Sequence, residues 1–214
     1  MLNIRVSKHP LVTHYLTKIR DKKTDLVNFM FSLEKISYLL ATEVYGDLEC
    51  ENKNIETPLK KSKGLKIKTK VVLLPILRAG LGLTQGFRDL YPNAIVSHIG
   101  LYRDEESLKP IKYYFKFPEL KDKAHIKVIV LDPMIATGGS IIFTLEYLIN
   151  MNIKDINVVS VLCAPEGIAA IEKRFSSKDK KLIKIFTCNV DEKLNDQGYI
   201  LPGLGDAGDR LFGT

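Results

Sequence analysis

The sequence predicts an α/β protein with a doubly wound, mainly parallel sheet of about five strands flanked by helices. Two observations carry this prediction. Short, continuous runs of Val, Ile and Leu occur without polar alternation, which is typical of strands that are covered on both faces. Helical spacing of apolar residues follows most of these runs, as in repeated strand–helix units. The 214 residues, 45% of them hydrophobic, suffice for a single domain spanning 1–214.

Residues 1–50 are expected to form N-terminal helices. In "LVTHYLTKIR" and "TDLVNFMFSLEKISYLLATEVY", apolar residues recur every three or four positions. Thr24 and Asp25 are candidate caps for the second helix. The lysine-rich stretch 50–69 that follows is interpreted as a connector, because such charge runs are typical of solvated loops.

The sheet core is placed at 71–187. Because strands in such a fold are joined by right-handed crossovers, their carboxyl ends meet at one edge, where ligands bind. The predicted strands are 71–77, 94–101, 127–131, 156–164 and 181–186, and the predicted helices are 80–91, 139–151 and 165–175.

Residues 102–118 do not fit the alternation of strands and helices. They contain Pro110 and Pro118 and are too long for a simple turn, so we interpret them as a flexible hairpin arm. Such an arm could close over a site and exclude water. Dimer contact or simple packing explains its aromatic cluster equally well; the cluster consists of Tyr113, Tyr114, Phe115 and Phe117.

Residues 188–214 are rich in glycine and proline from Gly198 onward. They are too irregular for helix or strand, yet apolar enough to be ordered. We therefore expect the chain termini to form a small hood over one end of the sheet. Tyr199 in this stretch is either a core residue or a side chain that stacks on a ligand.

The bulk composition argues against several classes of protein. The net charge of +7 is mildly basic, but the lysines gather in short runs, 59–70 and 176–184, which is weak support for a nucleic-acid partner. Small anionic substrates suit this charge equally well. Cys50, Cys163 and Cys188 lack the spacing of a disulfide framework or a zinc site. No run is apolar enough for a membrane span or signal peptide, so a cytoplasmic location is expected.

The motif "DPMIATGGS", residues 132–140, lies between a predicted strand and a predicted helix. Its small residues let main-chain N–H groups and the positive end of the helix dipole approach an anion, and Thr137 and Ser140 add hydroxyl donors. Asp132 could accept hydrogen bonds from two neighbouring hydroxyls, so the motif suits a sugar phosphate. The alternative is an ordinary junction in which Thr137 or Ser140 caps the helix. No lysine follows the glycines, which argues against a nucleoside triphosphate loop.

The stretch "VIVLDPMIATGGS" resembles the 5-phosphoribosyl-1-diphosphate (PRPP) motif of type I phosphoribosyltransferases, in the Asp-Pro form of the uracil phosphoribosyltransferases. Further marks of that family follow in order: "PILRAGLG", "YRDEESLKP" with "YYFKFP", "APEGIAAIEK" and "GYILPGLGDAGDRLFGT". The resemblance covers nearly all of the chain. The lysine-rich connector and "FSSKDKKLIKIF" match least.

This resemblance implies that PRPP is bound by two arginines, the small-residue turn and a C-terminal acid. Arg78 would bind the diphosphate, since a guanidinium suits bidentate recognition. Mg²⁺ would be held chiefly by PRPP oxygens, with weak help from Asp206 and Asp132. The PRPP-binding residues implied are Arg78, Arg103, Asp132, Pro133, Met134, Ile135, Ala136, Thr137, Gly138, Gly139, Ser140 and Asp206, of which Arg78, Asp132 and Asp206 would be catalytic.

The resemblance also implies that uracil is bound by Ile200, Gly205, Asp206 and Ala207, and that uracil and PRPP give UMP and diphosphate in pyrimidine salvage. No histidine shares spacing with an acid or cysteine, so His9, His14, His98 and His125 are not expected to act in catalysis. Family members suggest a homodimer or higher oligomer and GTP as an allosteric activator. Two alternatives stay open: an RNA-binding regulator of pyrimidine genes on the same fold, and a phosphoribosyltransferase for another base.

Overall fold

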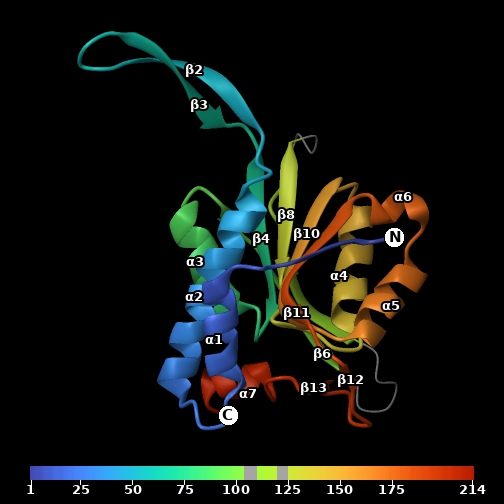
Figure 1. Ribbon diagram of the computed structural model, residues 1–214. Helices are drawn as coiled ribbons and strands as arrows, with labels where there is room; N and C mark the ends of the chain where they lie inside the picture. The colour runs from blue at the N-terminus through green and yellow to red at the C-terminus, as the bar shows by residue number, and fades with distance from the viewer. Residues whose placement is uncertain (104–109, 120–124) are drawn as a thin grey trace.

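The computed structural model describes residues 1–103, 110–119 and 125–214, and a nine-stranded sheet forms its centre (Figure 1). All pairings in this sheet are parallel except the one between its last two strands. The order along the sheet is β1 (Asn3–Val6), β11 (Ile183–Val190), β10 (Asp155–Cys163), β8 (Ile126–Leu131), β4 (Lys70–Leu77), β6 (His98–Arg103) and β7 (Pro110–Lys116), with β5 (Ile95–Val96) beside β4 and β9 (Met134–Ile135) beside β10.

Helices cover both faces of the sheet (Figure 1). Side chains along β4 alternate between them: Val71 and Leu73 pack with the N-terminal helices, while Val72 and Leu74 pack with the helices on the other face. One face carries α1 (Pro10–Arg20), α2 (Leu26–Tyr45) and α3 (Leu81–Leu90); the other carries α4 (Gly139–Asn150), α5 (Pro165–Arg174) and α6 (Ser177–Lys180).

The predicted fold class is confirmed. Each of the five predicted strands is present, although the one expected at 94–101 is divided into β5 and β6 around Ser97. The sheet is larger than predicted because β1 and β7 extend its two edges. Asp25 caps α2, since its carboxylate accepts a hydrogen bond of 2.8 Å from the Asn28 N–H.

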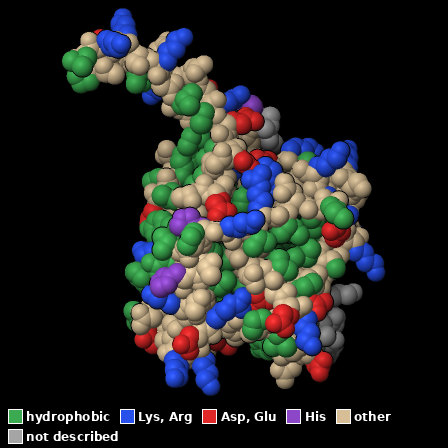
Figure 2. Space-filling view, viewed as in Figure 1, with side chains coloured by type: hydrophobic (Ala, Val, Ile, Leu, Met, Phe, Trp, Pro, Cys, Tyr) green, Lys and Arg blue, Asp and Glu red, His purple; other side chains and the backbone are tan. Residues whose placement is uncertain are grey.

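The connector at 50–69 is solvated as expected, but it contains two strands that the sequence did not predict. β2 (Cys50–Glu56) and β3 (Lys61–Ile67) form an antiparallel hairpin that protrudes from the body of the molecule (Figure 1). Both faces of this hairpin meet solvent, so the sequence shows no alternation of apolar and polar residues. On the face shown in Figure 2, basic side chains are scattered over the hairpin and the body and do not form one patch.

The C-terminal segment is also more regular than predicted. β12 (Lys193–Leu194) pairs with β13 (Ile200–Leu201), and α7 (Ala207–Phe212) follows. α7 contacts α2, so the C-terminal segment and an N-terminal helix meet at the end of the sheet (Figure 1).

Phe115 and Phe117 on and after β7 pack against the body. Their rings stack with centroids 5.8 Å apart. The Phe115 ring also meets the Tyr147 ring of α4 edge to face, with centroids 4.6 Å apart. Packing, one of the roles considered for the aromatic cluster, therefore applies to these two residues. The tip of the expected arm, residues 104–109, lies outside the described residues.

All three cysteines are free, with Cys50 exposed and Cys163 and Cys188 buried. Within the described ranges, no helix has the length and hydropathy needed to cross a membrane.

Candidate active site

The end of the turn between β8 and α4 is packed so closely that Gly138 and the facing Gly167 have no room for a side chain. Gly138 is the N-cap of α4 and has a φ of 83°, which L side chains rarely adopt. A Cβ on Gly138 would lie 2.9 Å from the carbonyl oxygen of Gly167. A Cβ on Gly167, in the first turn of α5, would lie 2.3 Å from the Ala136 oxygen. The turn is therefore pressed against the start of α5.

The hydroxyls of this turn do not cap the helix. The N-cap of α4 is Gly138, and among the described residues no side chain caps this helix, so the alternative in which Thr137 or Ser140 is an ordinary cap is wrong. The N-terminal N–H groups of α4 and these two hydroxyls surround a small hollow of about 90 Å³. An exposed helix N-terminus with added hydroxyl donors suits an anion. The hollow is lined by Asp132, Met134, Ala136, Thr137, Gly138, Gly139, Ser140 and Ile141.

Asp132 lies at the edge of this hollow, directly after β8. It is half-buried, and the only hydrogen bond of its carboxyl within the described part of the chain is a long one of 3.4 Å from the Met134 N–H. Removal of the carboxyl from water raises the pKa of Asp132 to about 7, because the charged form is poorly compensated. A ligand that donates hydrogen bonds to this carboxyl would stabilise its charged form.

Arg78 follows the neighbouring strand, β4, and is exposed. β4 and β8 are adjacent, with Pro75 opposite Leu131. A Cβ on Gly80 would lie 2.2 Å from the Leu131 oxygen, so the turn that carries Arg78 packs on the strand end that leads into Asp132. The two turns thus form one surface at the carboxyl edge of the sheet.

Phe212, the last residue of α7, contacts this surface. The Arg78 guanidinium lies 5.5 Å from the centre of the Phe212 ring, within the range of a cation–π interaction. Sequence reasoning did not find Phe212, because no local pattern connects it with an arginine at the other end of the fold. The contact brings the C-terminal segment to the diphosphate-binding residue that the resemblance implied.

The residues expected to bind the base lie in the C-terminal loop around β13 and α7. Ile200 and Ala207 are buried, Gly205 has a φ of 82°, and Asp206 is exposed. One carboxylate oxygen of Asp206 accepts a hydrogen bond of 2.9 Å from the Asp209 N–H and so caps α7. The structure thus adds a capping role to Asp206 that sequence reasoning missed.

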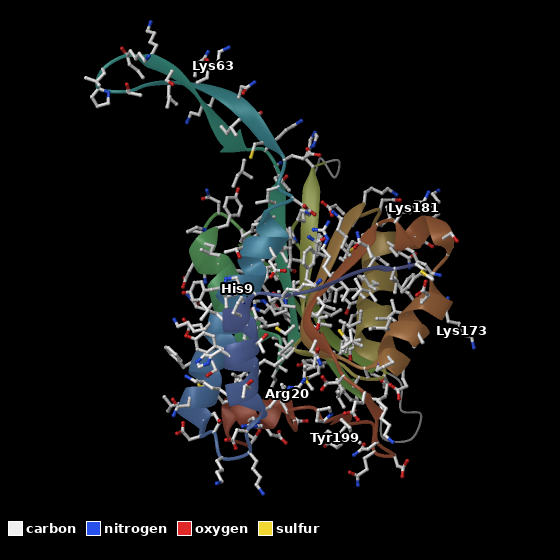
Figure 3. All side chains as sticks on the ribbon, viewed as in Figure 1. His9, Arg20, Lys63, Lys173, Lys181 and Tyr199 are labelled. Atoms are coloured by element: carbon white, nitrogen blue, oxygen red, sulfur yellow. The ribbon has the colours of Figure 1, made fainter. Side chains whose placement is uncertain are left out.

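Tyr199, beside this loop, is 46% exposed, so the expectation of a core tyrosine is wrong (Figure 3). Arg103 ends β6 opposite Pro110, but its side chain lies outside the described residues. Two of the histidines have local partners: His9 Nδ1 accepts from the Leu11 N–H at 3.2 Å, and His125 Nδ1 lies 3.2 Å from Glu49.

The family model for uracil phosphoribosyltransferase matches residues 6–214. The chain belongs to the uracil phosphoribosyltransferase family. A uracil phosphoribosyltransferase of Dictyoglomus turgidum is 49% identical over 210 residues and covers 98% of both chains. One from Wolinella succinogenes is 46% identical, with 97% of each chain covered. The chain is therefore an enzyme of the pentosyltransferase class.

Solved structures agree with this family fold. A protein from Aquifex aeolicus superposes with a TM-score of 0.88 at 38% identity, covering 98% of this chain and 97% of that one. An adenine phosphoribosyl transferase from Trypanosoma brucei superposes with a TM-score of 0.58 at 13% identity, covering 92% of this chain and 87% of the other. At that identity the second likeness shows the fold alone.

Replacing Gly138 with valine should weaken binding of PRPP. The change forces an L side chain into a left-handed conformation, which costs about 1–2 kcal/mol, and moves the turn away from Gly167. Calorimetric titration with PRPP would measure the loss. Gly64→Val is the matched control, because a Cβ at Gly64 on the protruding hairpin meets only ordinary contacts at 3.6 Å or more. Equal PRPP affinity in both variants would contradict the placement of the phosphate.

The raised pKa of Asp132 should make stability depend on pH. Between its ordinary value of 3.8 and about 7, the folded state keeps a proton that the unfolded chain has released. The stabilisation of the folded state by this bound proton is complete below pH 3.8 and is lost as pH rises to about 7. The free energy of unfolding of the wild type, relative to Asp132→Asn, should therefore fall over this range in urea titrations. A constant difference would show that the Asp132 carboxyl is ionised in the folded state throughout.

Proposed function

We propose that the protein transfers the 5-phosphoribosyl group of PRPP to N1 of uracil, which yields UMP and diphosphate in pyrimidine salvage. The observation that carries this proposal is the meeting of three segments: the turn after Asp132, the turn with Arg78, and α7, whose Phe212 lies beside Arg78. Membership of the uracil phosphoribosyltransferase family supports the same reaction.

The 5′-phosphate would bind in the hollow at the start of α4. Residues 136–140 present main-chain N–H groups and the hydroxyls of Thr137 and Ser140, which together can hold phosphate oxygens. Pro133, Met134 and Ile135 link Asp132 to residues 136–140, and Met134 itself lines the hollow. The positive end of the α4 dipole would also stabilise the charge of the phosphate, and the helix is already oriented before the phosphate binds.

The ribose would lie against Asp132. Its two hydroxyls would donate hydrogen bonds to the carboxylate and so lower the raised pKa of this group. Binding would therefore favour the ionised form of Asp132 at neutral pH. Arg103, from the end of β6, would be the second arginine that binds PRPP.

Arg78 would bind the diphosphate and stabilise the charge that develops as it departs. The guanidinium has five N–H donors in a fixed plane, and the Phe212 ring beside it limits its orientations. The anomeric carbon would gain oxocarbenium character, and N1 of uracil would form the new bond as the bond to diphosphate breaks. The N1 proton would pass to the departing diphosphate or to water. Positioning and electrostatics would supply most of the rate.

The described residues suit a magnesium ion that arrives with its substrate. They contain no group of three or more His, Cys, Asp or Glu side chains able to hold a metal, whereas PRPP itself offers many oxygen ligands. Asp206, exposed beside the C-terminal loop, and Asp132 offer carboxylate oxygens as additional ligands. Mg²⁺ so bound would neutralise part of the negative charge on the diphosphate.

The C-terminal loop would recognise uracil through Ile200, Gly205, Asp206 and Ala207. Uracil offers N3–H as a donor and O4 as an acceptor, and cytosine reverses both. A rigid loop that pairs with uracil would leave two groups unpaired with cytosine, at about 1–3 kcal/mol each. From the family we also expect a homodimer or higher oligomer, activation by GTP and a cytoplasmic location.

One assay distinguishes this function from the alternatives. The protein is incubated with PRPP, Mg²⁺ and uracil, cytosine or hypoxanthine, and the nucleotide formed is identified by chromatography. We expect UMP to form when the base is uracil, and no nucleotide to form with cytosine or hypoxanthine. IMP would indicate another base, and tight RNA binding without any nucleotide product would indicate a regulator. The scattered lysines of Figure 2 give the RNA-binding alternative little support.

Asp206→Asn should lower turnover by about a hundredfold while the protein stays folded. Asparagine caps helices as well as aspartate, so α7 should persist, whereas the negative charge beside the substrates is lost. Steady-state kinetics and a melting curve would measure the two effects separately. Asp209→Asn, on the same helix, is the matched control. Near-normal turnover of Asp206→Asn would show that the carboxylate is dispensable.

A further inference from the structure

The loop proposed to bind the base is tied to the end of the first helix. Arg20, the last residue of α1, donates to the carbonyl of Gly203 at 2.7 Å and to both carboxylate oxygens of Asp191 at 2.8 and 2.5 Å (Figure 3). Gly203 lies between Ile200 and Gly205, two residues that would line the base. One guanidinium therefore joins the end of α1 to two points of the C-terminal segment, which lies far from α1 in the sequence.

Asp191 is the acidic partner of Arg20 in this contact. Its side chain is fully buried and accepts hydrogen bonds from the Gly203 N–H at 3.0 Å and the Asn189 amide at 2.7 Å. Burial alone would raise its pKa, but hydrogen bonds from Arg20, Asn189 and Gly203 hold the pKa of Asp191 below its ordinary value. The Asp191 N–H bonds to the Cys163 carbonyl at 2.8 Å, so the carboxylate is anchored on the end of β10.

Gly203 is thus held at both of its main-chain polar groups. Its φ is 63°, and a Cβ there would lie 2.1 Å from the Ile200 oxygen, so the loop folds tightly back at this point. Because the N–H and the carbonyl are both fixed, the peptide planes on either side of Gly203 have little freedom. Those planes lie within the short loop between Ile200 and Gly205, so the loop is fixed at its middle.

A second arginine binds the loop one residue further along, at Leu204. Arg210 on α7 donates to the Leu204 carbonyl at 2.8 Å and to the Ile19 and Asp21 carbonyls at the end of α1. Its guanidinium lies 4.5 Å from the Phe29 ring centre. The last carbonyls of α1 have no partner within the helix, so they are natural acceptors for this contact.

We propose that Arg20 and Asp191 are positioning residues for uracil: their ion pair holds Gly203, and thereby the main-chain groups that read the base, in the orientation that uracil requires. This inference rests on the proposed function. Neither residue touches the hollow at the start of α4. Their loss should weaken binding of the base much more than binding of PRPP.

Lysine cannot replace Arg20 in this role. A guanidinium can bond the Asp191 carboxylate in a bidentate manner and reach the Gly203 carbonyl at the same time, whereas an ammonium is a single point donor. Arg20→Lys keeps the positive charge beside buried Asp191, so the fold should persist. The variant therefore tests the geometry of the contact and leaves its charge unchanged.

The experiment compares Arg20→Lys with the wild type in steady-state kinetics and PRPP titration. We expect the KM for uracil to rise about tenfold, equivalent to about 1.4 kcal/mol, with the Kd for PRPP changed less than about twofold. Arg174→Lys is the matched control, because it alters a pair with Glu146 between α5 and α4 and lies away from the loop. This control should change neither constant.

An unchanged KM for uracil in Arg20→Lys would overturn the inference, and so would an equal loss of affinity for uracil and PRPP. Hydrogen exchange of peptides covering 198–206 gives a readout that does not depend on activity. It should be faster in Arg20→Lys than in the wild type and unchanged in Arg174→Lys. A wild type that forms no UMP would refute the proposed function, while the exchange result would still support or overturn the contact itself.

Discussion

The close approach of main chains at the carboxyl edge of the sheet is the constraint on which the site depends. Side chains of any size are excluded where Gly80 meets the Leu131 carbonyl and where Gly167 meets the Ala136 carbonyl. These contacts join the turn after β4, the turn after β8 and the start of α5 into one surface. Their exclusion of Cβ atoms explains why small residues gather at places that are remote from one another in the sequence.

This surface is less positively charged than the net charge of +7 suggests. Most lysines lie on the protruding hairpin, on α6 or on other exposed positions, while the hollow itself has the α4 N-terminus and hydroxyls as donors. Asp132 faces this hollow with a raised pKa. In the proposed site, attraction for anions would therefore come from main-chain dipoles and Arg78, whose positions are better defined than those of flexible lysines.

Local patterns in the sequence predicted those features that depend on local physics. Strands β4, β8 and β10 are buried on both faces and so appear as mainly apolar runs, and Asp25 could be recognised as a cap from its position alone. The β2–β3 hairpin was missed because both of its faces are solvated. The pair of Arg20 with Asp191 was missed for a different reason: its members are 171 positions apart, and only the tertiary fold brings them together.

The C-terminal segment shows why the long-range contacts matter most for the site. α7 has only six residues, too few to be stable as an isolated helix. Its order comes from the Asp206 cap, from Arg210 on the end of α1 and from Leu211 against Gly82 of α3. Phe212 at its end then meets Arg78, while the loop before it carries the residues proposed to read the base. α7 therefore carries the ring beside Arg78, whereas Arg20 and Asp191 hold the loop at Gly203, before this helix begins.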